Sequence, residues 1–379
     1  MITGVYFGGS SVDLNTIAYD CSITIGRRDH TTAYAPSSCR MTFYDVVATP
    51  YTALVGKTLR VQGAGYKLFG GYITDVRLTV ATATSGARCD IIAAGPSSRL
   101  GLITVGGSGY AAQTIANRCA AIANDVTSQD ATFTFANETG TDEGTYTLSA
   151  YSSGATTATT ALQNTLDFVN GCLYDNPYGG GETGRVSYFT PDCSVVSTLT
   201  PASSSILFAP TFEQSGQIIN DVTVNYNTGT ILRSSTLSQT LYGKRSQTVT
   251  TTIDNATHAT DLADELIARV RRPRWAISDV TIEQPLAGSE TLYTRIGGKF
   301  TITNLPTGAP RSTYTGIVQG WEHRIASNKF RTTFYLADPN DVGLALLWNE
   351  IPSTSAYRWN TIDPNVIWDN ALTIADITA

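Results

Sequence analysis

The carboxylates that could do acid–base chemistry gather in one short stretch of the sequence: Asp254, Asp261, Asp264 and Glu265. Glycoside hydrolysis uses two such carboxyl groups at a defined separation across the scissile bond. These four lie around the start of a predicted amphipathic helix, where the helix dipole favours negative charge, and arginines follow at its end. A role in stabilising the helix explains them more simply than catalysis does.

A glycine pattern suggests a second kind of site. Gly107, Gly109 and Ala112 have the spacing G-x-G-x-x-A, after the apolar run 100–105 and before a predicted helix. Such a loop can hold a phosphate at the N-terminus of the helix that follows it. No alternating strand–helix–strand pattern follows here, however. An ordinary turn between a strand and a helix is the better interpretation, so we predict no nucleotide cofactor.

The histidines and cysteines show no grouping typical of a metal site or an activated nucleophile. His30, His258 and His323 lie far apart, and neither His-x-His nor His-Glu-x-x-His occurs. The six cysteines are scattered without a CxxC pair: Cys21, Cys39, Cys89, Cys119, Cys172 and Cys193. We expect small buried side chains rather than a disulfide framework. The sequence therefore predicts no catalytic residue, no metal site and no enzyme activity.

A basic cluster could contact DNA phosphates or an acidic partner. Arg269, Arg271 and Arg272 crowd the last turn of the predicted helix 257–271, which Pro273 ends. Cations favour a helix C-terminus, and the planar guanidinium group suits ion pairs at interfaces, so we interpret them as helix-capping and partner-interface residues. The helix itself is indicated by apolar residues three and four apart: Ala259, Leu262, Ala263, Leu266, Ile267 and Val270.

Composition narrows the class of protein. The 379 residues have only 15% charged side chains and a net charge of -6, with 19 tyrosines against 2 methionines. This balance favours strands and turns, and the acidic net charge argues against a nucleic-acid binder that relies on phosphate contacts. We find no stretch long enough to span a membrane and no signal-peptide pattern at the N-terminus. We therefore expect a chain kept, or assembled, in a cytoplasm.

Residues 1–97 alternate between apolar and polar positions in short runs, as strands of a small barrel or sandwich do. Part of this pattern recurs near the other end of the chain. The match pairs Gly56-Lys57, Gly71 and Gly95-Pro96 with Gly298-Lys299, Gly316 and Asp338-Pro339. It predicts two similar β-modules that flank a middle region, although two unrelated strand–turn–strand units would give the same pattern.

The first two predicted regions are a β-barrel module and an insert. Residues 1–97 form the first β-barrel module. Residues 98–205 form an inserted α+β region, with helices near 110–124 and 160–170 and a glycine-rich hairpin near 172–189. The predicted fold class is therefore mainly β with an α+β insert.

The last two predicted regions are a second β-barrel module and a terminal arm. The second module covers residues 206–340 and contains the helix with the basic cluster. Residues 341–379 form an extended arm, in which Trp348, Trp359 and Trp368 are each followed by Asn or Asp. These tryptophans are too many to leave solvated, so we predict that the arm docks on its own body or on a neighbour, with the three tryptophans at the interface.

The region around the helix resembles a known family. The strand Tyr242-Gly243-Lys244-Arg245, a polar turn, a helix of the form Ala-x-x-Leu-Ala-x-x-Leu-Ile-x-Arg, the stop Arg272-Pro273 and a strand at 275–282 follow in that order. This order resembles the last third of minor tail proteins of the baseplate hub class in long-tailed bacteriophages. With Gly26-Arg27, the insert and the Gly-Lys repeat, the resemblance covers most of the chain.

The resemblance implies a structural virion protein at the tail tip. Such hubs are homotrimers in which two β-barrels per chain alternate in a ring of six modules. The ring adapts a sixfold tail tube to a threefold tip and surrounds the channel through which DNA passes. The implied partners are a distal tail protein or tail-tube ring, the tape measure protein and tip or fibre proteins, after assembly in the cytoplasm of the bacterial host.

Two other classes of protein remain as alternatives. A carbohydrate-binding or adhesive β-protein, for example a receptor-binding protein, would use the tyrosines and the 5 tryptophans as platforms for sugars. A glycosidase would need a pair of carboxylates that the sequence does not convincingly offer. Binding to a glycan array would favour the first alternative, and cell-wall hydrolysis would favour the second.

Overall fold

The computed structural model describes most of the chain between Ile2 and Asp338. It leaves out residues 1, 13–17, 30–31, 33, 45–52, 64, 82–86, 139–145, 153, 167–168, 170, 180, 190–197, 200–205, 207–209, 215–217, 272, 274, 285–294, 306–308, 310–312, 327–328 and 339–379. The predicted arm 341–379, with its three tryptophans, therefore lies outside the described residues.

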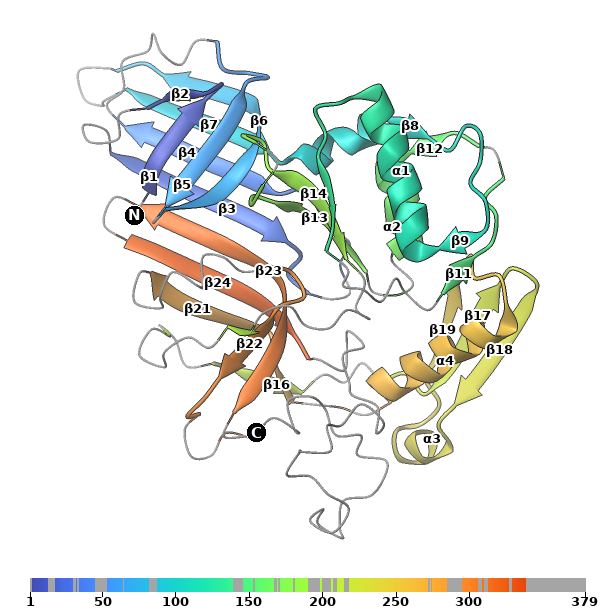
Figure 1. Ribbon diagram of the computed structural model, residues 1–379. Helices are drawn as coiled ribbons and strands as arrows, with labels where there is room; N and C mark the ends of the chain where they lie inside the picture. Colours follow the sequence, from blue (N-terminus) through green and yellow to red (C-terminus); the bar gives the residue numbers. More distant parts are fainter. Residues whose placement is uncertain are drawn as a thin grey trace.

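A twelve-stranded sheet made from both ends of the chain is the largest element of the fold (Figure 1). Its strands are β1 (Ile2–Phe7), β2 (Ser10–Ser11), β3 (Tyr19–Gly26), β4 (Ser38–Tyr44), β5 (Thr58–Gly63), β6 (Tyr66–Thr79), β7 (Arg88–Ala94), β15 (Thr198–Leu199), β21 (Asp279–Gln284), β22 (Lys299–Ile302), β23 (Tyr314–Ala326) and β24 (Lys329–Ala337). The order is β15-β22-β23-β3-β4-β7-β6-β5-β1-β2, with β24 on the other edge of β23 and β21 beyond it.

Alternating side chains give strands β3 and β5 of this sheet one buried face. Strand β5 alternates half-buried and buried residues along its whole length, and β3 follows the same period of two. The buried residues of both ends of the chain form a single core cluster, which includes Phe43, Phe69, Phe300 and Phe334. Because the strand path has two ends, the described strands form no closed barrel. The structure is mainly β, as the sequence predicts. The arrangement of its strands in two barrels stays a prediction.

The predicted repeat is present strand for strand. Strands β4, β5, β6 and β7, the first repeat, are connected in the same way as β21, β22, β23 and β24, the second repeat. A bulge lies at the same place in both long strands, between Ile73 and Asp75 in β6 and between Val318 and Gly320 in β23. On the partner strands, Ala94 pairs with Tyr72 as Ala337 pairs with Ile317. The predicted match of Gly95-Pro96 with Asp338-Pro339 follows directly from this register.

The turns that enter the two repeats correct the predicted alignment by one residue. Gly56 and Gly297 both have positive φ, at 83° and 84°. The Gly56 N–H donates to Ile73 O at 2.8 Å, and the Gly297 N–H donates to Val318 O at 2.9 Å. Gly56 therefore corresponds to Gly297 rather than to Gly298, since a left-handed turn residue favours glycine and Gly297 is the one that occupies it.

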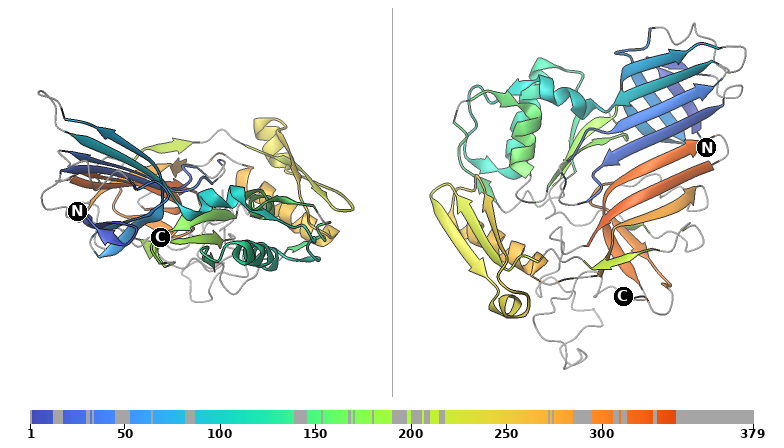
Figure 2. Two further views of the ribbon diagram at one scale, coloured as in Figure 1. Left: turned by 90° about the horizontal axis from the view of Figure 1, so that it is seen from above. Right: turned by 180° about the vertical axis from the view of Figure 1, so that it is seen from behind.

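A second hydrophobic core lies beside the large sheet and is built from the insert and from a later segment of the chain (Figures 1 and 2). The insert contributes η2 (Pro96–Leu102), β8 (Thr104–Val105), β9 (Gln113–Thr114), α1 (Ile115–Gln129), β10 (Phe135–Asn137), β11 (Thr147–Leu148), β12 (Thr156–Thr157), α2 (Ala158–Leu166), β13 (Cys172–Asn176) and β14 (Arg185–Phe189). A later segment adds β17 (Asp221–Tyr226), β18 (Gly229–Ser234), α3 (Thr236–Tyr242), β19 (Ser246–Thr250) and α4 (Ala256–Val270). The later segment is flanked in the sequence by β16 (Phe212–Gln214) and β20 (Trp275–Ile277), which pair antiparallel with each other.

The predicted helices and hairpin are present, with shifted ends. Helix α4 begins one residue before the predicted 257–271, and the Asn255 side chain accepts the His258 N–H as N-cap. Helix α1 begins at Ile115 rather than near 110, because Tyr110 pairs with Tyr151 and Thr114 caps the helix. The buried face of α4 belongs to the second core, where Leu262 and Ala263 are fully covered, whereas the sequence pattern groups this helix with the second β-module. The domain boundaries themselves stay a prediction.

Candidate functional site: the joint between the two repeats

The two halves of the large sheet meet where β3 pairs with the distal part of β23, which we call the inter-repeat joint. The register sets Gly26 opposite Gly320 and Ile23 opposite His323. Gly26 has φ +81°, and a Cβ on Gly320 would lie 2.6 Å from the backbone oxygens of Ile25 and Arg27. The strands approach this closely because both facing positions lack side chains.

Polar side chains fix the end of the joint. The bulged residue Gln319 is buried, and its Oε1 accepts a hydrogen bond from Arg27 Nε at 2.9 Å. The Arg27 guanidinium lies over the Tyr34 ring, 4.3 Å from its centroid, and the Arg27 N–H donates to Gln319 O at 3.0 Å. These contacts tie the end of β3 to the bulge of β23.

His323 lies inside the joint, fully buried between β3 and β24. Its Nδ1 is 2.9 Å from Thr332 Oγ1, and its ring meets Phe330 edge to face. Burial lowers the pKa of His323 from its ordinary value of 6.5 to about 3. The imidazole is therefore neutral in the folded protein at every pH near neutrality, and its role is to pack in the core and hydrogen-bond across the strands.

The depressed pKa predicts how acid affects the joint. The folded protein accommodates only neutral His323, so its contribution to stability is full above pH 6.5 and is lost as the pH falls toward 3. The loss approaches about 1.4 kcal/mol per pH unit. We expect His323→Gln, measured by urea unfolding from pH 7 to 4, to show a shallower fall in unfolding free energy than the unmodified chain. Equal slopes would contradict this assignment.

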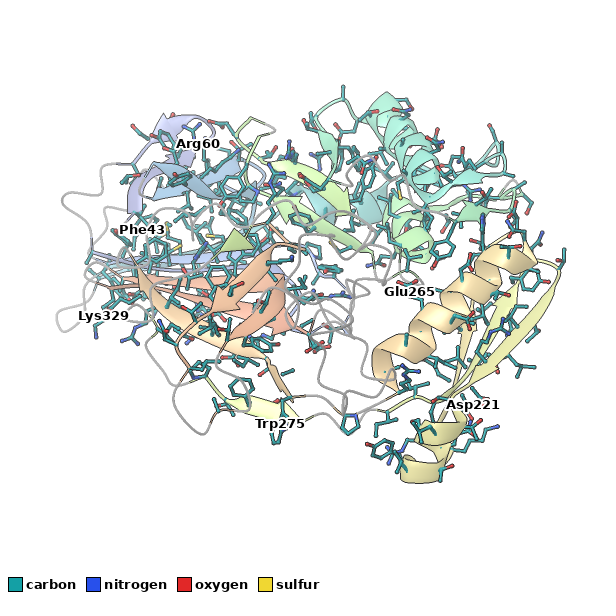
Figure 3. The ribbon with its side chains drawn as sticks, turned by 60° about the horizontal axis from the view of Figure 1, so that its bottom comes forward. Phe43, Arg60, Asp221, Glu265, Trp275 and Lys329 are labelled. Carbon is teal, nitrogen blue, oxygen red and sulfur yellow. The ribbon has the colours of Figure 1, made fainter. Side chains whose placement is uncertain are left out.

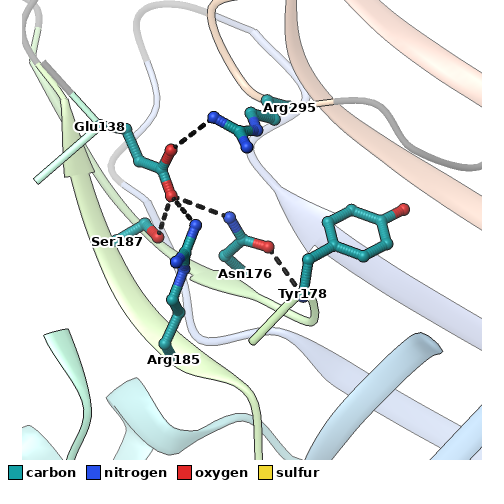
Figure 4. Close-up of polar contacts among 6 residues, drawn as sticks. All are labelled: Glu138, Asn176, Tyr178, Arg185, Ser187 and Arg295. Atoms are coloured by element: carbon teal, nitrogen blue, oxygen red, sulfur yellow. Dashed lines mark hydrogen bonds and ion pairs between the residues drawn. The ribbon is translucent and has the colours of Figure 1, made fainter. Parts of the chain in front are cut away.

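A second polar cluster joins the insert to the second repeat (Figure 4). Glu138, whose side chain is 8% exposed, accepts hydrogen bonds at Oε1 from Arg185 (2.6 Å), Ser187 (2.9 Å) and Asn176 (3.0 Å). Its Oε2 accepts one from Arg295 at 2.9 Å. Arg295 begins the turn that enters the second repeat, so this carboxylate bridges the two cores.

The insert also contacts the first repeat through a buried carboxylate and through its glycine-rich loop. Asp175 of β13 accepts the N–H groups of Ser37 and Ser97, both at 2.7 Å. Burial raises the pKa of Asp175, and these donors oppose that rise. In the loop, Gly179 O accepts a hydrogen bond from Lys67 Nζ at 2.9 Å, and Glu182 accepts one from Thr58. The hairpin is therefore anchored to the first half of the sheet.

The residues that the sequence suggested for chemistry are not brought together. Asp264 pairs with Arg233 at 2.6 Å, and Glu265 accepts a hydrogen bond from Tyr146 where α4 faces the insert (Figure 3). The glycine loop before α1 is separated from the helix by β9, and its Gly106 N–H faces Asp125 at 3.4 Å. A carboxylate at that position repels a phosphate. Among the described residues, no three His, Cys, Asp or Glu side chains form a metal site.

The predicted interface residues are described only in part. The side chains of Arg269 and Arg272 lie outside the described residues, as do the three tryptophans of the arm. Arg271 is the C-cap of α4, and its carbonyl oxygen accepts a hydrogen bond from Ser238 of α3 at 2.6 Å. Arg271 thus lies at the end of the helix, and both its helix-capping role and a partner interface there stay predictions.

The five described cysteines are all buried, and no disulfide joins them. They are Cys21, Cys39, Cys89, Cys119 and Cys172. This agrees with the expectation of small core side chains. None of the helices in the described part of the chain is long and apolar enough to span a membrane.

Comparisons with known structures identify the fold. The chain is similar to the tail protein from Neisseria meningitidis MC58, with a TM-score of 0.64 and 12% identity over 90% of this chain and 98% of that one. It is also similar to the 43 kDa tail protein of prophage MuSo2 from Shewanella oneidensis, with a TM-score of 0.61 and 11% identity over 90% of this chain and all (100%) of that one.

A third similar structure is prophage tail protein gp18 from Listeria monocytogenes EGD-e, with a TM-score of 0.52 and 11% identity over 88% of this chain and 93% of that one. Comparisons with family models and with curated protein sequences give no match. The chain therefore has the fold of phage tail proteins, as the sequence resemblance implied.

Proposed function

We propose that this chain is a structural protein of a phage tail, located at the tail tip as the baseplate hub. The observation that supports this most strongly is the repeat of strands β4–β7 as β21–β24 within one sheet. A hub between a sixfold tube and a threefold tip needs two similar units per chain, and this chain has two. The similar structures named above are tail proteins, which makes a structural role more fitting than an enzymatic one.

In the proposed assembly, three chains form a ring in which first and second repeats alternate around a central channel. Closed cyclic symmetry satisfies strand edges that a single chain leaves exposed. DNA would pass through the channel without sequence-specific contacts, in keeping with the net charge of -6. The partners would be a distal tail protein or tail-tube ring, the tape measure protein and tip or fibre proteins, and the particle would assemble in the host cytoplasm.

The two β-barrel modules, the four predicted regions and the partner-interface residues belong to the same proposal. The end of α4, with Arg269, Arg271 and Arg272, would contact a neighbouring tail protein. The arm 341–379, with its three tryptophans, would dock on its own body or on the next chain. Neither contact involves a catalytic group or a cofactor.

The first test is the solution mass. We expect the purified 40.5 kDa chain to elute as a stable threefold species in size exclusion coupled to light scattering, over a range of concentrations. Negative-stain images of that species should show a ring with six similar lobes. A chain that stays monomeric alone and after mixing with its tail-tube protein would contradict the hub, and glycan binding would then be measured.

A further inference from the structure

Two segments of the insert, residues 106–112 and 149–155, run side by side along the edge of the insert that faces away from the large sheet (Figure 1). Each contains one tyrosine, and the backbones of Tyr110 and Tyr151 pair through N–H···O bonds of 3.0 and 2.9 Å. Every other residue of both segments is glycine, alanine or serine. The two tyrosine rings are therefore the only large side chains that these segments contain.

A glycine lies against both rings. Their centroids are 6.0 Å apart and their planes are tilted by 38°. A Cβ on Gly106 would lie 3.2 Å from the Tyr151 ring and 3.4 Å from the Tyr110 ring, and the φ of +78° at Gly106 favours glycine. The Tyr151 side chain is exposed, at 37%, and Tyr110 is half-buried. The loops thus present a pair of aromatic rings to solvent with only small neighbours in sequence.

A carboxylate lies beside the ring pair. Asp125 of α1 accepts a hydrogen bond at Oδ2 from the Tyr110 hydroxyl at 2.6 Å, and the same oxygen faces the Gly106 N–H. Burial and this hydrogen bond raise the pKa of Tyr110, so the phenol keeps its proton and donates it. The other oxygen, Oδ1, has no hydrogen-bond partner among the described residues. Because Asp125 is only half-buried, it is accessible to a donor from outside the chain.

This combination of groups suits an uncharged sugar. The C–H face of a pyranose ring packs on an exposed aromatic ring, and a carboxylate oxygen accepts hydrogen bonds from its hydroxyls. The negative charge of Asp125 repels an anionic sugar or a phosphate. A proline-rich peptide also packs on tyrosines, but proline side chains offer the carboxylate no donor.

We propose that Tyr110, Tyr151 and Asp125 form a binding site for an uncharged saccharide. The exposed Tyr151 ring packs against the sugar, and Asp125 Oδ1 accepts a hydrogen bond from one of its hydroxyls. The site lies within the insert of a single chain, so it does not rest on the proposed hub. On a tail protein, it would bring the tail into contact with a polysaccharide at a cell surface.

Calorimetric titration of the full chain with short sugars tests the site. The probes are cellotetraose, mannotetraose, galactotetraose and chitotetraose, and an anionic tetrasaccharide of galacturonic acid should not bind. We expect at least one neutral probe to bind, and Tyr151→Ala to weaken its binding at least about tenfold because the exposed ring is lost. Tyr151→Phe keeps the ring and should stay within about twofold of the unmodified chain. Asp125→Asn should also weaken binding.

Tyr242→Ala is the matched control, since Tyr242 on α3 is 36% exposed and lies outside the site. It should bind the sugar as the unmodified chain does, and thermal unfolding would verify that all variants fold. The site is wrong if no neutral probe binds, if Tyr242→Ala weakens binding as much as Tyr151→Ala, or if the chain binds a polyproline peptide instead. A threefold species in light scattering that binds no sugar would exclude this site and leave the hub intact.

Discussion

Gly320→Val is expected to destabilise the protein by at least about 3 kcal/mol. A Cβ at this position meets the backbone oxygens of Ile25 and Arg27 at 2.6 Å, and backbone atoms cannot move away as the end of a flexible side chain can. The facing residue, Gly26, has a positive φ, so the backbone of β3 cannot readily shift to make room for a side chain at position 320. Relief requires separation of β3 from β23, which exposes Trp321 and His323.

The matched control is a glycine in open space. A Cβ on Gly107 meets nothing within 4 Å, and its φ is not positive, so Gly107→Ala should change the midpoint of urea unfolding very little. The same denaturation series on Gly320→Ala and Gly320→Val should show a graded loss. If both Gly320 variants unfold at the same midpoint as the Gly107 variant, the tight approach of the two strands at the joint is wrong.

The repeat was predictable from sequence because glycines mark it at places that the backbone requires. Gly71 and Gly316 lie at the same position in the two long strands, two residues before the bulge begins to shift the register. The predicted alignment slipped by one residue at Gly297-Gly298, where either glycine satisfies the pattern. Only the turn geometry, with φ 84° at Gly297, decides between them.

The joint itself was not predictable from local pattern. It joins residues that are far apart in the sequence. Arg27 and Gln319, for example, are separated by 292 positions. Gly26-Arg27 belongs to the family resemblance, but nothing near it in the sequence indicates that Gly320 faces it. Local periodicity reports which face of a strand is buried, and it says nothing about which distant strand lies beside it.

The same limit applies to helix starts and to buried charge. Residues 110–114 continue the apolar spacing of α1, yet they form a bridge and a short strand because the 147–151 segment pairs with them. Glu138 carries no sequence signal either, since its donors come from three separate segments.

Glu138→Ala is the second substitution for which we expect a large effect. Removal of this carboxylate leaves Arg185 and Arg295 without their shared acceptor, in a place where their side chains are only 25% and 30% exposed. Breaking a buried pair from one side costs about 3–5 kcal/mol, because the remaining charge stays desolvated. Partial exposure of the arginines puts the expected loss of unfolding free energy at the lower end, about 3 kcal/mol.

The exposed pair Arg233–Asp264 provides the comparison. Its two atoms are 2.6 Å apart, as close as the Glu138–Arg185 contact, but the side chains are 39% and 57% exposed. Asp264→Ala should therefore cost less than about 1 kcal/mol. Because Arg295 belongs to the second repeat and Glu138 to the insert, a double-mutant cycle between them measures how strongly the two cores are coupled. A coupling near zero, with Glu138→Ala as mild as Asp264→Ala, would show that this carboxylate does not couple the two cores.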